Sequence, residues 1–208
     1  MRNITLVLIA VLLISACSES PDSGSGSVSG QPFTQMLVYP KKNPVVPFRL
    51  IAQDNSEFSH ESFKGKWNLL FMGFTNCPDV CPTAMTDMAH IYNAIDPNVQ
   101  QNFRVAFLSV DPKRDTPEHI AAYLEFFHKD FVGITGQKSE IDKLVSSLGG
   151  IYSIGTEDES YYSVDHTARI FIVSPKSERY GIIRGEVMHT KEWTQLVKEL
   201  NQLGASQG

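Results

Sequence analysis

The feature that most constrains this fold is the stretch Gly-Phe-Thr-Asn-Cys-Pro-Asp-Val-Cys-Pro-Thr at residues 73–83. It joins an apolar run, Trp67–Phe74, to an amphipathic segment that begins at Pro82. An apolar run of this length is typical of a buried strand, and proline is favoured in the first turn of a helix. The stretch therefore predicts a strand-to-helix turn that carries Cys77 and Cys81.

The position of the two cysteines favours their deprotonated form. The start of a helix offers free N–H donors and the positive end of the helix dipole, which together stabilise a thiolate. We therefore expect lowered pKa values for the thiols of Cys77 and Cys81. A thiolate is both a nucleophile and a metal ligand, so a disulfide, a redox pair and a metal site all remain open at this point.

The N-terminus is typical of an exported lipoprotein. Arg2 precedes the apolar segment Ile4–Ile14, and the sequence Leu-Ile-Ser-Ala-Cys at residues 13–17 resembles a bacterial lipobox. This resemblance implies a signal peptide over residues 1–16 and a lipid on Cys17. The alternative is an uncleaved anchor helix. Both readings place the domain on the periplasmic side of a bacterial membrane, and the first makes it lipid-anchored.

Residues 17–46 are predicted to form the lipidated N-terminus and a linker. Ser18–Gly30 has the serine- and glycine-rich composition of a flexible tether, and the proline-rich segment 31–47 is expected to be irregular. The formal net charge is −5 and no basic run is present, which argues against nucleic acid as a partner. With Cys17 assigned to the lipid, the other two of the three cysteines form one pair.

The remaining segments alternate between predicted strands and helices. The expected strands cover residues 48–52, 57–58, 67–74, 103–110, 131–135, 151–154, 169–173 and 180–184. The expected helices cover residues 82–95, 117–128, 139–148 and 190–203. Such an order requires a mostly parallel central sheet, to which the last hairpin adds antiparallel strands. We predict an α/β, thioredoxin-like domain over residues 47–204, with a mixed sheet flanked by helices and an extra N-terminal β-hairpin.

Two further segments are expected beside the cysteines, because functional crevices lie beyond the carboxyl ends of the strands in such sheets. They are the loop 111–116 and the segment 162–167. Ordinary thioredoxin-like oxidoreductases carry a cis-proline in the second of these places. This chain has no proline between Pro117 and Pro175 and offers His166 instead. Imidazole is the commonest metal-binding side chain.

The spacing of the cysteines also favours a metal. Three residues separate Cys77 from Cys81, where a redox Cys-x-x-Cys motif has two, so both sulfurs can turn toward one ion. Two thiolates and the imidazole of His166 form a soft set that suits Cu(I) and can hold Cu(II). Zinc would normally need a fourth ligand, which water or an aspartate could supply.

Three motifs together identify a family. The motif at residues 73–83, Ser-Val-Asp-Pro-Lys-Arg-Asp-Thr-Pro at 109–117 and Val-Asp-His-Thr-Ala at 164–168 closely resemble the Sco/SenC copper-binding proteins. The resemblance implies a thioredoxin-like fold with copper ligands Cys77, Cys81 and His166.

The same resemblance implies a partner and a role. The role is maturation of the binuclear copper centre of cytochrome c oxidase subunit II, by copper delivery, by cysteine reduction or by both. A periplasmic copper donor or thiol reductant would be the second partner. The resemblance also implies that Asp111 and Asp115 lie around the copper ligands without binding copper themselves. By local chemistry alone, the two aspartates would be explained as residues of a turn and of a helix start.

Two functions of different classes follow. In the first the chain is a membrane-tethered metallochaperone, and in the second it is a thiol–disulfide reductase that uses Cys77 and Cys81 as a redox pair. A peroxidase is disfavoured, because Pro82-Thr83 follows the second cysteine instead of preceding a reactive one.

Overall fold

The computed structural model describes residues 33–155, 162–191 and 193–206. The predicted signal peptide 1–16, the lipid-bearing Cys17 and the tether 18–30 lie outside the described residues. The compact unit that contains the sheet spans Gln31–Gly208. Within the described ranges, no helix combines the length and the apolar character needed to cross a membrane.

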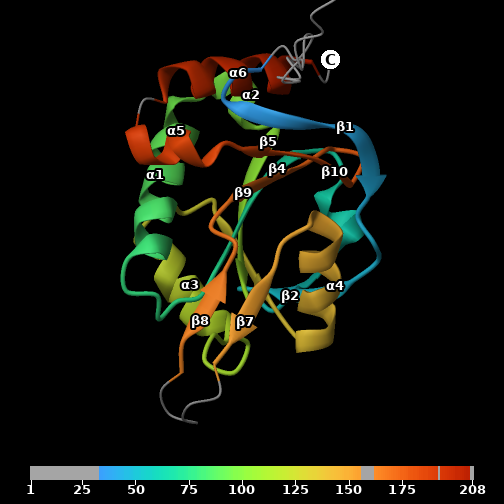
Figure 1. Ribbon diagram of the computed structural model, residues 1–208, viewed down its shortest axis with the longest axis vertical. Coiled ribbons are helices and arrows are strands. Elements are labelled where there is room, and N and C mark those ends of the chain that lie inside the picture. The colour runs from blue at the N-terminus through green and yellow to red at the C-terminus, as the bar shows by residue number, and fades with distance from the viewer. Residues whose placement is uncertain (1–32, 156–161, 192, 207–208) are drawn as a thin grey trace, which may run out of the picture. The chain divides into compact units, whose positions relative to one another are not determined.

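An eight-stranded mixed sheet organises this unit (Figure 1). Its strands, in spatial order, are β1 Met36–Pro44, β10 Glu178–Ile183, β9 Ile170–Val173, β4 Trp67–Gly73, β5 Phe103–Ser109, β6 Val132–Thr135, β2 Arg49–Ala52 and β3 Glu57–Ser59. The central strands β4, β5 and β6 are parallel, and all other pairs in the sheet are antiparallel. A separate two-stranded ribbon consists of β7 Tyr152–Ile154 and β8 Val164–His166.

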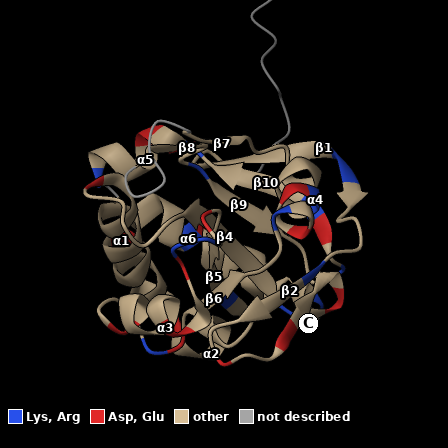
Figure 2. Cartoon of the chain, turned by 90° about the horizontal axis from the view of Figure 1, so that it is seen from below, with Lys and Arg blue, Asp and Glu red and all other residues tan. Residues whose placement is uncertain are grey.

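Helices cover both faces of the sheet. They are the short 3-10 helix η1 His60–Phe63 and the α-helices α1 Val80–Ala94, α2 Pro97–Gln100, α3 Pro117–Glu125, α4 Lys138–Leu148, α5 Gly185–Thr190 and α6 Thr194–Ala205. Figure 2 shows α1 and α3 on one side of the central strands and α4 on the other. Because helices cover both faces, the central strands must be apolar along their whole length. All seven residues of β4 are buried, which meets this requirement.

The register of the central strands sets the position of the site. Trp67 pairs with Phe103 and Gly73 pairs with Ser109, so β4 and β5 begin and end at the same levels. The loops that follow the two strands therefore start side by side. One of these loops carries Cys77, and the other begins beyond Ser109 with Val110 and Asp111.

The main features of the predicted fold are confirmed. The extra hairpin is β2–β3, the sheet is mixed, and the final strands β9 and β10 are antiparallel neighbours. Thr116 caps α3 as its side chain accepts the His119 N–H, and Pro117 is the first helical residue.

Some boundaries were wrong. Residues 36–44, predicted to be irregular, form the edge strand β1, which pairs with β10 from Met36 to Pro44. The register of this pairing shifts between Val38 and Asn43. The proline between these two residues is tolerated because β1 is an edge strand and its pairing is irregular there. The predicted helix from residue 190 starts instead at Thr194, and the separate helix α5 precedes it.

Candidate metal centre

Cys77 and Cys81 lie where β4 passes into α1. Cys77 is half-buried in the connecting loop, and Cys81 is the buried second residue of α1, so the helix starts two residues before the predicted Pro82. Both cysteines are free thiols. The Cys81 N–H donates to Cys77 Sγ at 3.4 Å. The Cys77 sulfur thus accepts an N–H of the first helical turn, where no intrahelical acceptor exists.

His166 is presented by the β7–β8 ribbon. It is the last residue of β8 and pairs with Tyr152 of β7, so it belongs to a strand and not to the predicted loop. Its ring packs at nearly right angles against the rings of Phe71 and Phe74, and its centroid lies 5.8 and 6.1 Å from their centroids. Strand pairing fixes the backbone and the two aromatic rings fix the imidazole.

The three side chains converge on one point. One ligand atom each from Cys77, Cys81 and His166 lies within 4.8 Å of the others, and His166 Nε2 is 3.5 Å from Cys81 Sγ. They lie at a pocket of about 500 Å³ to which Cys77 and His166 contribute lining atoms. The expected convergence is therefore present, although 85 positions separate Cys81 from His166 in the chain. Their role as ligands remains a prediction.

Burial sets the protonation of two of these groups. It raises the pKa of the Cys81 thiol, with a further rise from the hydrogen bond with Cys77. The expected lowering is thus wrong for Cys81, because loss of solvent outweighs the helix start. Burial also lowers the pKa of His166 below its ordinary value, so the imidazole is neutral at pH 7. A neutral imidazole has a lone pair to give, and a bound cation would offset the cost of forming a buried thiolate.

The second ring nitrogen of His166 has no fixed partner. Nδ1 is buried without a hydrogen bond, and the adjacent Thr167 N–H donates to the Ile151 carbonyl at 3.0 Å. Metal-binding histidines usually donate their other N–H to an acceptor. Here packing against Phe71 and Phe74 holds the ring in place.

Asp115 holds the loop that leads to Cys77. Its carboxylate, 1% exposed, accepts the Thr75 N–H at 2.9 Å, the Thr75 hydroxyl at 2.5 Å and the Ser109 hydroxyl at 2.6 Å. Thr75 stands two residues before Cys77. The carboxylate therefore ties the loop after β4 to the end of β5, and its two oxygens are occupied by these donors.

Asp111 connects the second loop to the chain that leads into β8. The fully buried carboxylate accepts the Tyr162 hydroxyl at 2.6 Å and the Arg114 Nε–H. The Arg114 guanidinium carbon lies 3.8 Å from the centroid of the Tyr162 ring, and its Nη1 donates to the Tyr162 carbonyl at 3.3 Å. Arg114 and Tyr162 are not among the site residues that the sequence predicts. The Asp-to-Arg spacing of three residues was a signal for Arg114, and nothing local indicated Tyr162.

The absence of a side chain at Gly73 leaves room for the sulfur of Cys81. A Cβ at this position would lie 2.8 Å from Cys81 Sγ and 2.8 Å from the ring of Phe107. Both distances are shorter than van der Waals contact. The glycine at the end of β4 is therefore required by the sulfur beneath it.

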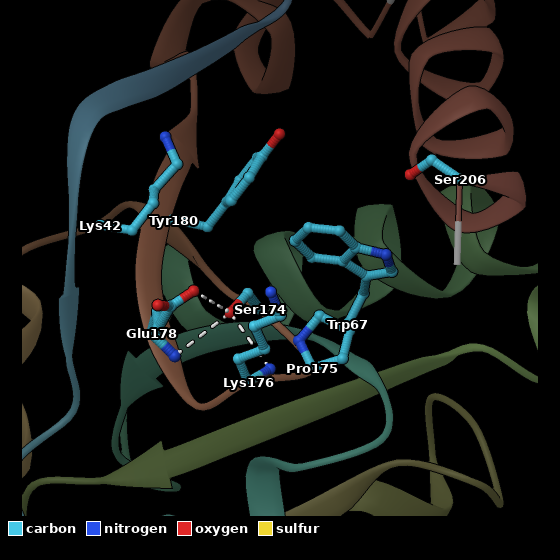
Figure 3. A pocket seen from close by; sticks show the side chains of 8 residues that line it. All are labelled: Lys42, Trp67, Ser174, Pro175, Lys176, Glu178, Tyr180 and Ser206. Carbon is cyan, nitrogen blue, oxygen red and sulfur yellow. Dashed lines mark hydrogen bonds between the residues drawn. The ribbon is translucent and has the colours of Figure 1, made fainter. Parts of the chain in front are cut away.

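Another pocket, at the opposite end of β4, has different chemistry (Figure 3). It measures about 450 Å³ and is lined by Trp67, Tyr180, Lys42, Lys176, Glu178, Ser174, Pro175 and Ser206. The Lys42 ammonium lies 4.5 Å from the Tyr180 ring centroid, and the Ser174 hydroxyl donates to the Glu178 carboxylate at 3.2 Å. No cysteine or histidine lines this pocket. Among the residues that the structure describes, Cys77, Cys81 and His166 are the one group of cysteine, histidine or carboxylate side chains placed to share a metal ion.

The amino-acid sequence that forms this fold and site matches a family model. The model described as SCO1/SenC matches residues 39–202. This chain belongs to the SCO1/SenC family. A protein of Stutzerimonas stutzeri whose name describes it as copper-binding is 33% identical to this SCO1/SenC chain over 149 residues, which cover 72% of the chain and 73% of that protein.

Solved structures agree with this membership. Copper-bound ScoI of Bradyrhizobium japonicum matches with a TM-score of 0.61 and 33% identity, over 66% of this chain and 86% of that one. Apo Sco1 of Thermus thermophilus matches with a TM-score of 0.73 and 30% identity, over 84% and 99% of the two chains. The predicted thioredoxin-like class is confirmed by these neighbours. The SCO1/SenC chain spans less than half the length of the mitochondrial relatives from Arabidopsis thaliana and Homo sapiens that it matches.

Proposed function

We propose that this protein binds one copper ion through Cys77, Cys81 and His166 and passes it to a partner. The observation that carries the proposal is the convergence of two sulfurs and one imidazole nitrogen within 4.8 Å. The donor chemistry fits the cargo, because two thiolates and one imidazole suit Cu(I) without a fourth ligand. The copper-bound relative at 33% identity supports the same choice of metal.

The proposed recipient is subunit II of cytochrome c oxidase, whose binuclear copper centre would be matured by this delivery. Support for this recipient comes from membership in the SCO1/SenC family. We further propose that a lipid on Cys17 tethers the domain to the periplasmic side of a bacterial membrane. The lipobox-like sequence before Cys17 supports the tether.

Anaerobic copper loading of the reduced full-length chain tests the metal site. We expect one copper ion per chain, and a sulfur-to-metal charge-transfer band when Cu(II) is loaded. The His166→Ala variant should lose tight binding. The matched control is His90→Ala, which removes an exposed histidine that stacks on Trp193. Equal copper retention by the two variants would contradict the proposal.

A second function, thiol–disulfide reduction of the partner's copper-binding cysteines, is favoured by one observation. The free Cys77 and Cys81 lie close enough for the Cys81 N–H to bond to Cys77 Sγ, a suitable arrangement for a dithiol that exchanges with an external disulfide. Exchange would oxidise this pair to a disulfide and reduce the partner's disulfide to two thiols. His166→Ala separates the functions, because it should remove copper binding and preserve dithiol exchange.

A further inference from the structure

A third pocket adjoins the pocket that holds the thiols and the imidazole. It measures about 270 Å³ and lies between α1, β9 and α5, and we call it the α1–α5 pocket. Its apolar lining comes from Phe71, Ala84, Ile170 and Met188. Phe71 also packs against the ring of His166, so one side chain borders both the metal centre and this pocket.

The two pockets form a continuous surface. Val80 and Ala168 line both of them. Val80 is 49% exposed, which makes it one of the few large apolar side chains that face solvent in the described part of the chain. Cys81 is the next residue. A molecule that covers Val80 therefore lies beside the sulfur pair.

The α1–α5 pocket has an acidic wall. Asp87 is 3% exposed, and its Oδ1 lies 3.8 Å from Lys191 Nζ, beyond hydrogen-bonding distance. Asp79, the residue before Val80, adds an exposed carboxylate to the lining of this pocket, and the other titratable group of the lining is the exposed His189. A buried carboxylate with one distant cation gains from a second, closer cation. The pocket is thus complementary to an apolar group that carries a positive charge beside it.

We propose that the α1–α5 pocket docks the partner polypeptide, through an apolar side chain of the partner next to a lysine or arginine. This inference rests on the proposed function, in which a partner must bring its own ligand atoms to Cys77 and Cys81. Ligand exchange needs those atoms within bonding distance. An anchor directly beside Val80 supplies the required orientation, and its apolar contact excludes water from the exchange.

Titration of the full-length, metal-free and reduced chain with the soluble copper domain of cytochrome c oxidase subunit II from the same organism tests the docking. Thr83→Arg is the main variant, because Thr83 is exposed and lines the α1–α5 pocket without lining the sulfur pocket. An arginine there occupies the pocket and satisfies Asp87. We expect the Kd to rise at least about tenfold, as when an interface anchor is lost.

Thr86→Arg is the matched control. Thr86 is an exposed threonine on the same helix, and it lines neither pocket. We expect its Kd to stay within about twofold of the wild-type value, because it adds the same charge outside the interface. Equal Kd values for the two variants, or no binding by the wild-type chain, would overturn the docking proposal.

Asp87→Asn gives an independent reading of the charge. The variant should bind the subunit II domain about fivefold more weakly than wild type, with a smaller dependence on salt. An unchanged Kd and salt dependence would contradict the acidic part of the proposal.

Copper loading of Thr83→Arg, measured in parallel, separates the docking proposal from the proposed function. If Thr83→Arg binds one copper ion per chain and still binds the subunit II domain as tightly as wild type does, only the docking proposal is refuted. If the wild-type chain fails to bind copper, the proposed function is refuted.

Discussion

Two polar clusters lie side by side beyond the carboxyl ends of β4 and β5, and they differ in how fully their atoms are used. In the carboxylate cluster, Asp115 accepts three hydrogen bonds and Asp111 accepts from Tyr162 and Arg114. In the thiol–imidazole cluster, Cys77 Sγ accepts one N–H, and His166 Nε2 has Cys81 Sγ as its neighbour at 3.5 Å. The carboxylates are occupied in holding loops, and the sulfurs and the imidazole have capacity for a ligand.

This difference assigns separate tasks to neighbouring residues. A group whose hydrogen bonds are all internal contributes to the folded state, and its loss leaves buried partners unsatisfied. A group that makes few internal hydrogen bonds contributes little to the stability of the folded state. Its replacement mainly lowers the affinity for a ligand. We therefore expect substitutions in the carboxylate cluster to lower stability, and substitutions in the thiol–imidazole cluster to lower copper affinity.

The largest expected effect is on copper affinity in Cys77→Ser. The variant should bind Cu(I) more weakly by more than about 100-fold, beyond the range that supporting residues around a metal site show. Its free energy of unfolding without metal should change by less than about 0.5 kcal/mol, because the side chain is only half-buried. Competition titration and denaturant unfolding measure the two quantities. Wild-type copper affinity in this variant would end the assignment of Cys77 as a ligand.

Asp115→Asn should show the opposite pattern. Replacing one carboxylate oxygen by an NH₂ group removes an acceptor from Thr75 or Ser109, which should lower the free energy of unfolding by about 2 kcal/mol. Copper affinity should fall by less than about 100-fold, because only the loop before Cys77 relaxes. Denaturant unfolding of the metal-free chain and copper competition check this pair of results. A stable variant that has lost copper binding would break the distinction between the clusters.

Gly73→Ala should affect both stability and copper affinity, because Gly73 is the last residue of β4 and lies next to the Cys81 sulfur. The added methyl group would lie 2.8 Å from Cys81 Sγ and must displace it or Phe107. Overpacking of this kind costs about 1–3 kcal/mol of stability, and a displaced sulfur should also weaken copper binding. Thermal unfolding and copper competition of the same preparation test this. Unchanged copper affinity and unchanged stability would show that the sulfur is not confined as described.

The smallest expected effect concerns pH. Burial lowers the pKa of His166 in the folded state, so the unfolded chain binds more protons at this residue between the folded pKa and about 6.5. Stability without metal should therefore fall as the pH drops through that window, and be regained as it rises. Replacement by Ala should remove this part of the dependence. Ring-proton NMR of His166 should place its midpoint below that of an exposed histidine, and a midpoint above 6.5 would contradict the account.

The sequence predicted what local patterns and chain order determine. The apolar run before Gly73 indicated a buried strand, the Thr116-Pro117 pair indicated a helix start, and the alternation of elements indicated the sheet. The convergence of His166 with the cysteines followed from the rule that functional loops meet beyond strand ends. Each of these features depends on short stretches or on topology.

Features that depend on tertiary packing could not be predicted in this way. β1 is a strand because β10 offers it an edge, and its own prolines point to irregular chain. The thiol pKa of Cys81 rises because distant residues exclude water, an effect that outweighs the helix start in the local sequence. The contact of Tyr162 with Asp111 joins residues 51 positions apart, and no local pattern indicates it.

X-ray absorption spectroscopy of the Cu(I)-loaded chain shows whether the imidazole of His166 binds the metal together with the two sulfurs. We expect two sulfur ligands and one nitrogen ligand in the wild-type protein, with the nitrogen lost in His166→Ala and retained in His90→Ala. A sulfur-only ligand set that is the same in wild type and His166→Ala would contradict this expectation.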